Sequence, residues 1–99
     1  MNKYYNNYIK LGSDIVKHST IMAILIDQRT DAAPEVQKVL TDNGCLISTR
    51  LGMHESSSCA EEGMIILDLV GSQAEVAELQ EALTEIEGVK VKSMELDFE

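Results

Sequence analysis

Apolar and polar positions along the chain predict a series of six secondary-structure elements between Thr20 and Phe98. An unbroken apolar run predicts a first strand at about 20–27. A helix, a half-polar strand, a second apolar run at 64–70, a second helix and an alternating strand follow. This βαββαβ order is the split-βαβ, or ferredoxin-like, plan. We therefore predict an α+β sandwich with two helices on one face of a four-stranded antiparallel sheet of order 4-1-3-2.

Residues at the ends of both predicted helices support this order. Asp31 is the expected N-cap of the first helix, and Gly44 is a natural residue to end it in the left-handed conformation. Ser72 and Glu75 have the spacing of a capping box, in which each side chain satisfies a backbone N–H of the other residue. Gly88 is expected to end the second helix. The acidic residues of that helix are expected to form its solvated face.

The distribution of apolar residues also separates central strands from edge strands. The first and third strands are apolar on both faces, as expected of central strands, whereas the second and fourth contain Ser, Thr, Arg and Lys. Because both helices cover one sheet face, alternate residues of the first strand, either Met22/Ile24/Ile26 or Ile21/Ala23/Leu25, would be exposed on the other. Such an apolar surface marks an interface. We predict a homodimer or higher oligomer joined sheet against sheet.

The two edge strands carry further expectations. The second strand is predicted at 45–53, with Cys45 buried as a small apolar residue at its start. Its apolar positions Cys45, Ile47, Leu51 and Met53 are expected on one side, with Ser48 and Arg50 on the other. In the last strand the apolar phase changes after Val91, which suggests a bulge or bend near Ser93.

The segment 1–19 differs from the rest of the chain in its richness in Asn and Tyr. It is either an appended leader, which we favour, or an arm that packs on a neighbour. We therefore divide the chain into an extension, 1–19, and one domain, 20–99. The connection 54–63 is polar and long for a hairpin, and loops of this kind often carry binding function.

Composition excludes several classes of partner. The 99 residues include 17 acidic and 8 basic side chains, a net charge of −9. Nucleic-acid affinity depends largely on Lys and Arg, so direct binding of nucleic acid is disfavoured, as is binding to an anionic membrane. The apolar runs are far shorter than the roughly 20 residues that cross a bilayer. Two cysteines and no export signal favour a cytoplasmic protein with free thiols.

His54 and Cys59 are the candidate metal ligands, with Cys45 upstream. Their spacing matches no closed zinc pattern, so a solvated histidine and a surface thiol are the favoured interpretation. A catalytic Cys–His pair would also need an orienting group and oxyanion donors, which this loop does not supply. We predict no resident metal or cofactor and no catalytic residue.

Arg50, Gly52 and His54 cluster at the end of the second strand and are the candidate ligand-binding residues. The functional interpretation is a contact with an anion or small ligand at a subunit interface. The simpler interpretation is an edge-strand arginine, a bulge glycine and a loop histidine. Asp68 is unusual within an apolar strand, and a position at a bend or a pairing across the dimer would explain it.

The stretch from Ile24 to Leu96 resembles the small regulators associated with iron-only hydrogenase systems. The resemblance rests on the order and spacing of four segments, which are Ile26-Asp27-Gln28-Arg29, Val36-Gln37-Lys38-Val39-Leu40, Ile47-Ser48-Thr49-Arg50-Leu51-Gly52-Met53 and Ile86-Glu87-Gly88-Val89-Lys90-Val91-Lys92. It implies a homo-oligomeric, ACT-like ferredoxin fold related in shape to the regulatory domain of nickel-responsive repressors.

Two departures limit what this resemblance implies. Around the second strand the chain has one histidine, His54, in place of the repeated histidines of the nickel repressors, so nickel sensing does not carry over. Asp31-Ala32-Ala33-Pro34 stands where amino-acid-binding ACT domains have a Pro-Gly turn, so amino-acid binding does not carry over either.

Together these observations favour a non-enzymatic regulatory, ligand-binding or protein-interaction module, with a small-molecule effector among its partners. One alternative is a transition-metal sensor that uses His54 and Cys59. A second alternative is a small ferredoxin-like enzyme with an interfacial site, which the missing acid–base set disfavours.

Overall fold

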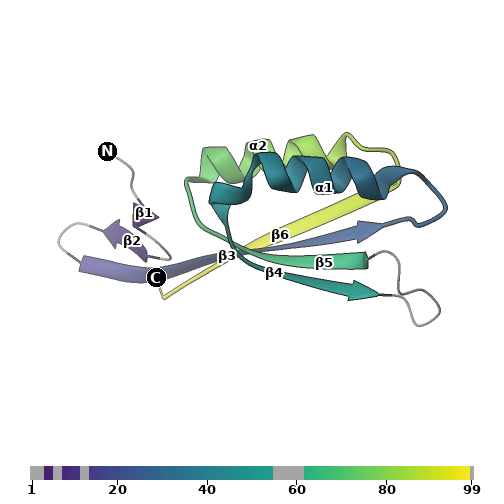
Figure 1. Cartoon of the computed structure of the whole chain (residues 1–99). Coiled ribbons are helices and arrows are strands. Elements are labelled where there is room, and N and C mark those ends of the chain that lie inside the picture. The colour runs from purple at the N-terminus through teal and green to yellow at the C-terminus, as the bar shows by residue number, and fades with distance from the viewer. Residues whose placement is uncertain (1–3, 6–7, 12–13, 55–61, 99) are drawn as a thin grey trace.

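The computed structural model describes residues 4–5, 8–11, 14–54 and 62–98 (Figure 1). The candidate metal ligand Cys59 and most of the 54–63 connection lie outside these ranges. The elements are β1 (Tyr4–Tyr5), β2 (Tyr8–Leu11), β3 (Asp14–Ile26), α1 (Ala32–Asp42), a short 3-10 turn (Gly44–Leu46), β4 (Ile47–His54), β5 (Glu62–Leu69), α2 (Gln73–Thr84) and β6 (Val89–Asp97).

The predicted ferredoxin-like fold is confirmed. The strands β6, β3, β5 and β4 form an antiparallel sheet in that order, which is the predicted 4-1-3-2 arrangement. Both helices lie on the same face of this sheet (Figure 1). The first strand begins at Asp14 rather than near Thr20, because β3 continues beyond the four-stranded sheet and pairs there with β2. β3 therefore crosses the predicted domain boundary at residue 20, and that boundary stays a prediction.

The hydrophobic core fills the space between the sheet and the two helices. Alternate residues of β3 from Met22 to Ile26 point into it, as do Ile65, Leu67 and Leu69 of β5. The helices contribute Val36 and Leu40 from α1, and Val76, Leu79 and Leu83 from α2. At the far end of the same face, His18 and Thr20 are buried, and their side chains are hydrogen-bonded at 3.2 Å (Nε2 to Oγ1). Every second side chain of β3 is buried, and this alternation fixes which face of the strand meets the helices.

The ends of the helices agree in part with the caps predicted from the sequence. The capping box is confirmed, since Ser72 Oγ accepts from the Glu75 N–H at 3.1 Å and the Ser72 N–H donates to Glu75 Oε1 at 2.9 Å. Asp31 occupies the N-cap of α1, but its side chain makes no capping bond; Thr30 Oγ1 accepts from the Ala32 N–H instead, at 3.3 Å. The expectation for Gly44 is wrong. It begins the 3-10 turn without a positive φ.

Both edge strands differ from expectation. Cys45 is an exposed free thiol in the 3-10 turn, not a buried residue at the start of a strand. The predicted bulge near Ser93 is absent, because the pairing of β6 with β3 runs without a shift from Val89 to Asp97. The register shift instead lies in β4, between Ile47 and Thr49.

Neither α1 nor α2 has the length and apolar character that a bilayer-spanning helix needs.

Candidate functional site

The sheet face opposite the helices, here called the open face, carries five exposed large hydrophobic residues among those that the structure describes. Pairing across the four strands places one set of alternate residues on it. They are Thr49, Leu51 and Met53 on β4, Met64, Ile66 and Asp68 on β5, Ser19, Ile21, Ala23 and Leu25 on β3, and Lys90, Lys92, Met94 and Leu96 on β6. Leu25, Leu51, Met53, Met94 and Leu96 are 39–57% exposed. No described part of the chain buries these five side chains, so water contacts them.

The apolar phase change in the last strand has its explanation here. Val89 is buried and Val91 packs partly against the core, both beneath α2. Further along the same strand, Met94 and Leu96 lie on the open face instead. The strand stays regular, and what changes is the face that carries apolar residues. The sequence signal for this half of the open face was present, but it fitted a bulge equally well.

Three charged residues lie on the open face among the side chains that the structure describes. Asp68 is on β5, level with Ile21, while Lys90 and Lys92 are on β6, level with Leu25 and Ala23. Asp68 is half-buried and both lysines are exposed. The acid and the two cations therefore lie on opposite sides of the central strand β3.

A bulge in β4 lies opposite Asp68. The register shift sets Thr49 opposite Asp68 and leaves Ser48 as the additional residue of β4. The Ser48 hydroxyl donates to the Asp68 carbonyl at 3.1 Å. The bulge also reverses the phase of β4, so that Ile47 packs partly against the core while Leu51 and Met53 face outward on the other side. These three residues do not share one face, contrary to expectation.

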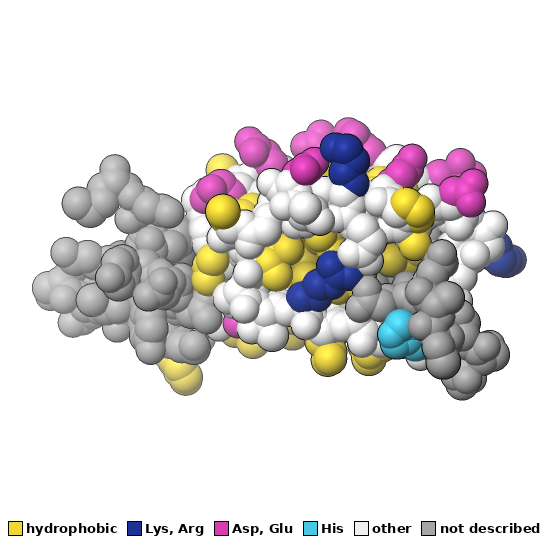
Figure 2. Space-filling model, in the orientation of Figure 1, with side chains coloured by type: hydrophobic (Ala, Val, Ile, Leu, Met, Phe, Trp, Pro, Cys, Tyr) yellow, Lys and Arg dark blue, Asp and Glu magenta, His cyan; other side chains and the backbone are white. Residues whose placement is uncertain are grey.

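Acidic side chains concentrate on the helical side of the molecule. Figure 2 shows Asp and Glu gathered over the helices, along the upper rim, while hydrophobic side chains project below the sheet. The exposed acidic residues of the helices and their ends include Glu35, Asp42, Glu75, Glu78, Glu81, Glu85 and Glu87. The net charge of −9 is therefore distributed unevenly. The charged residues among the described side chains of the open face are two lysines and one aspartate, so this face carries little of the negative charge.

The predicted ligand residues lie elsewhere. Arg50 and Gly52 pair with Leu67 and Ile65, which are core residues, so they occupy the helix side of the edge strand β4. His54 is the last residue of β4 and is exposed, beyond a second register shift. The three share one strand, but Arg50 and Gly52 are on the face opposite to the proposed interface. A ligand held by them would be separate from that interface.

Metal binding by His54 and Cys59 stays an untested prediction. Among the residues that the structure describes, no three His, Cys, Asp or Glu side chains lie close enough to hold a metal ion together.

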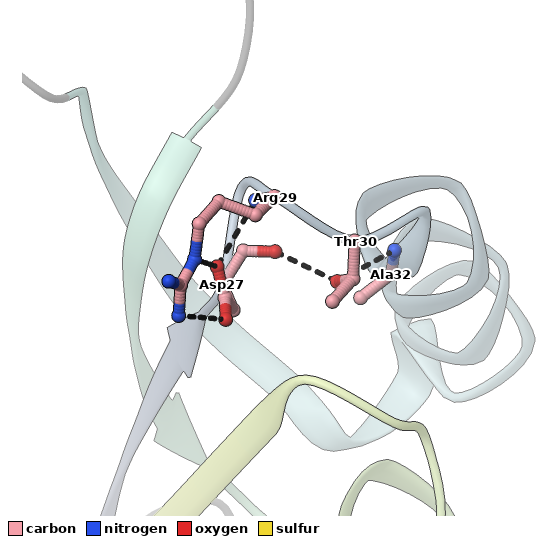
Figure 3. Close-up of polar contacts among 4 residues, drawn as sticks. All are labelled: Asp27, Arg29, Thr30 and Ala32. Atoms are coloured by element: carbon pink, nitrogen blue, oxygen red, sulfur yellow. Dashed lines mark hydrogen bonds and ion pairs between the residues drawn. The ribbon is translucent and has the colours of Figure 1, made fainter.

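The turn between β3 and α1 contains a compact polar cluster that the sequence analysis did not single out (Figure 3). The Asp27 carboxylate accepts from Arg29 Nε at 3.0 Å, from an Arg29 terminal nitrogen at 2.9 Å and from the Arg29 N–H at 3.0 Å. The hydrogen bond from the Arg29 side chain, followed by that from its backbone, lowers the pKa of Asp27 to about 2. Asp27 is thus a fixed anion at neutral pH and unsuited to act as a general base. The sequence signal that could have identified this cluster is an acidic residue followed two positions later by an arginine.

No protein-family model and no curated protein sequence matches the chain. Among solved structures, it is similar to the uncharacterized protein TM1266 from Thermotoga maritima, with a TM-score of 0.64 and 26% identity over 81% of this chain and 99% of that one.

A weaker likeness is to CPII, a nitrogen regulatory PII-like protein from Thiomonas intermedia K12. Its complex with ADP, AMP and bicarbonate gives a TM-score of 0.49 and 13% identity over 85% of this chain and 96% of that one. Its apo form gives 0.47 and 15% over 84% and 96%. The TM1266 likeness agrees with the ferredoxin-like fold, and the CPII likeness is too distant to bear on function.

Proposed function

We propose that this chain is a non-enzymatic regulatory module that works as a homodimer joined through its open face. The observation that carries the proposal is the set of large apolar side chains exposed on that face, Leu25, Leu51, Met53, Met94 and Leu96. Each Å² of apolar surface removed from water contributes about 25 cal/mol, so covering this area favours association. Several large apolar side chains exposed on one sheet face favour its use as an interaction site.

The regulatory part of the proposal rests on the sequence resemblance to the small regulators of iron-only hydrogenase systems. Two of its segments fall at structurally important positions. Asp27 and Arg29 form the polar cluster of the β3–α1 turn, and Gly88 lies at the α2–β6 turn with a positive φ of 86°. Both segments therefore contain residues that shape the two turns at this end of the fold.

The dimer would leave the helices and the helix side of β4 accessible. Arg50, Gly52 and His54 remain the proposed contacts for a small-molecule effector, with the Arg50 guanidinium as the group that binds an anion. An effector bound there could act on the helices and on β4 without displacing the second copy. A cytoplasmic location is part of the same proposal.

Light scattering on the purified chain tests the proposal. We expect a mass of two chains at micromolar concentration. Replacing Leu51, which is 57% exposed on the open face, with Asp should give a folded monomer, because the partner would have to bury an unpaired carboxylate. Ala77→Asp, on the exposed surface of α2, is the matched control and should remain dimeric. A wild-type chain that stays monomeric at micromolar concentration would refute the proposed dimer.

A further inference from the structure

We propose that the cleft between the β3–α1 turn and the start of β6 binds a small organic anion, and that Arg29 and Lys90 hold its carboxylate or phosphate group. The site is separate from the strand that carries Arg50, Gly52 and His54.

The cleft lies at one end of the sheet, where two turns meet, and has a volume of about 520 Å³. Its walls include Leu25 at the end of β3, Asp27 and Arg29 in the β3–α1 turn, and Gly88 and Lys90 at the start of β6. A hydrogen bond joins the two turns, since the Asp27 N–H donates to the Gly88 carbonyl at 2.8 Å. Backbone contact therefore fixes the two sides of the cleft relative to one another.

Asp27 holds the Arg29 guanidinium in one orientation. The carboxylate accepts from Nε at 3.0 Å and from one terminal nitrogen at 2.9 Å, which occupies one edge of the planar group. The other terminal nitrogen points away from Asp27 (Figure 3). The outer edge, between the two terminal nitrogens, therefore presents N–H groups that can bind a carboxylate or phosphate in a bidentate manner. The Arg29 side chain is 90% exposed, so a solute can reach this edge. Because Asp27 orients the group beforehand, binding loses less side-chain entropy.

Lys90 supplies the second cation. It is exposed on β6, level with Leu25, and lines the same cleft as Arg29. Within the described part of the chain, its ammonium group forms no hydrogen bond or ion pair. Its charge therefore offsets the repulsion between the Asp27 carboxylate and an anion bound to Arg29. Lys92 lies two residues further along the same face of the strand and does not line the cleft.

The charges of the cleft indicate the class of ligand. One carboxylate and two cations line it, so its local charge is positive in a chain whose total charge is −9. A positive cleft attracts an anion, whereas the negative charge of the whole chain disfavours a highly charged one such as a polyphosphate. Leu25 is 49% exposed and adds apolar surface beside the cations. The matching ligand has one carboxylate or phosphate group and a short apolar part.

The proposed contacts all lie within one chain, so the inference does not rest on the proposed dimer. Leu25 and Lys90 belong to the open face, but Arg29 does not. The last pair between β3 and β6 joins Ile26 to Val89, and Arg29 lies in the turn beyond it. The cleft is therefore at the rim of the open face, and ligand binding and the mass of the assembly are separate measurements.

Titration of the isotope-labelled full chain, followed by NMR at constant ionic strength, tests the site. The probes are acetate, 3-methylbutanoate and inorganic phosphate. We expect saturable shifts of the Arg29 Nε–H signal and of the Gly88 and Lys90 amide signals with at least one of them. The probe that binds most tightly identifies carboxylate or phosphate as the preferred group. Because 3-methylbutanoate adds apolar carbons to the same carboxylate, it should bind about threefold or more tightly than acetate.

Substitutions distinguish a site from a general response to charge. Lys90→Gln removes one cation of the cleft and should weaken binding about fivefold. Lys92→Gln, the same change of charge on the same face of β6, is the matched control and should weaken binding less than about twofold. Arg29→Lys keeps the charge but loses the planar fork, and should also weaken binding about fivefold. Circular dichroism checks that each variant is folded.

The outcomes separate this inference from the proposed function. Saturable binding that Lys90→Gln weakens more than Lys92→Gln supports the site. The absence of saturable shifts with all three probes overturns it, as do equal losses in the two lysine variants. Equal binding of 3-methylbutanoate and acetate rejects the apolar contact with Leu25. A monomer that binds the probes supports the site and refutes the dimer, whereas a dimer that binds none does the reverse.

Discussion

Gly88 lies so close to Thr30 that a Cβ atom added to the glycine would be 2.5 Å from the threonine Oγ1. Hydrogen bonds hold the two connections together at this point. The Asp27 N–H donates to the Gly88 carbonyl at 2.8 Å, and the Thr30 hydroxyl donates to the Asp27 carbonyl at 2.7 Å. The β3–α1 turn is thereby closed onto the α2–β6 turn.

Replacing Gly88 with Ala should therefore lower the free energy of unfolding by about 1–3 kcal/mol, because a Cβ both meets Thr30 and disfavours the positive φ. Urea denaturation measures the change. Gly44→Ala is the control, since a Cβ there meets nothing within 4 Å, and its effect should stay within about 0.5 kcal/mol. Equal losses in the two variants would contradict the close packing.

The capping box at the start of α2 gives a second prediction. Ser72→Ala removes the hydroxyl that accepts from the Glu75 N–H and should destabilise the protein by about 1 kcal/mol. Glu75→Gln keeps an acceptor for the Ser72 N–H and should have a smaller effect, since Gln also occurs at this position of capping boxes. Thermal unfolding of both variants distinguishes a cap from a general effect of substitution at this end of the helix.

The pH dependence of the β3–α1 turn gives a third prediction. The hydrogen bonds from Arg29 lower the pKa of Asp27 to about 2. Because this pKa lies below the unfolded value of about 3.9, the contribution of Asp27 to stability is present above that value and is lost as the pH falls toward 2. Carboxyl carbon shifts measured by NMR should show this midpoint. Arg29→Ala should raise it toward the ordinary range, whereas Arg50→Ala should leave it unchanged.

The extension gives a fourth prediction. The pairing of β3 with β6 begins at His18 and its pairing with β5 at Thr20, so removing residues 1–17 keeps every pair of the four-stranded sheet. The melting temperature should then change little. Removing residues 1–20 also deletes the buried His18 and Thr20 and should lower it clearly. A large loss on removal of 1–17 alone would show that the extension supports the fold.

Much of the fold was accessible from the sequence because its signals are local. Two-sided apolar runs identified β3 and β5 as central strands, and the Ser72–Glu75 spacing identified the start of α2. Gly44 failed as a predicted left-handed cap. The Asn43 side chain instead donates to the Val39 carbonyl at 2.8 Å, and a 3-10 turn follows. Several ways of ending a helix compete there, and tertiary contacts decide between them.

The candidate site was less accessible because it depends on which face each strand presents. A bulge in β4 reversed the phase between Ile47 and Leu51, whereas the apolar shift in β6 between Val91 and Met94 involved no bulge. The same sequence pattern fits either case, and only pairing with a neighbouring strand distinguishes them.

The concentration of acidic residues on the helical layer has a consequence for how association responds to ionic strength. Each chain carries a charge of −9, so two approaching copies repel one another over distances comparable with the Debye length, about 10 Å at 0.1 M salt. Contact between apolar faces does not depend on this screening. Added salt therefore removes long-range repulsion before it weakens attraction. The dimer should tighten as salt is raised from low concentration, the reverse of what a nucleic-acid-binding protein does with its ligand.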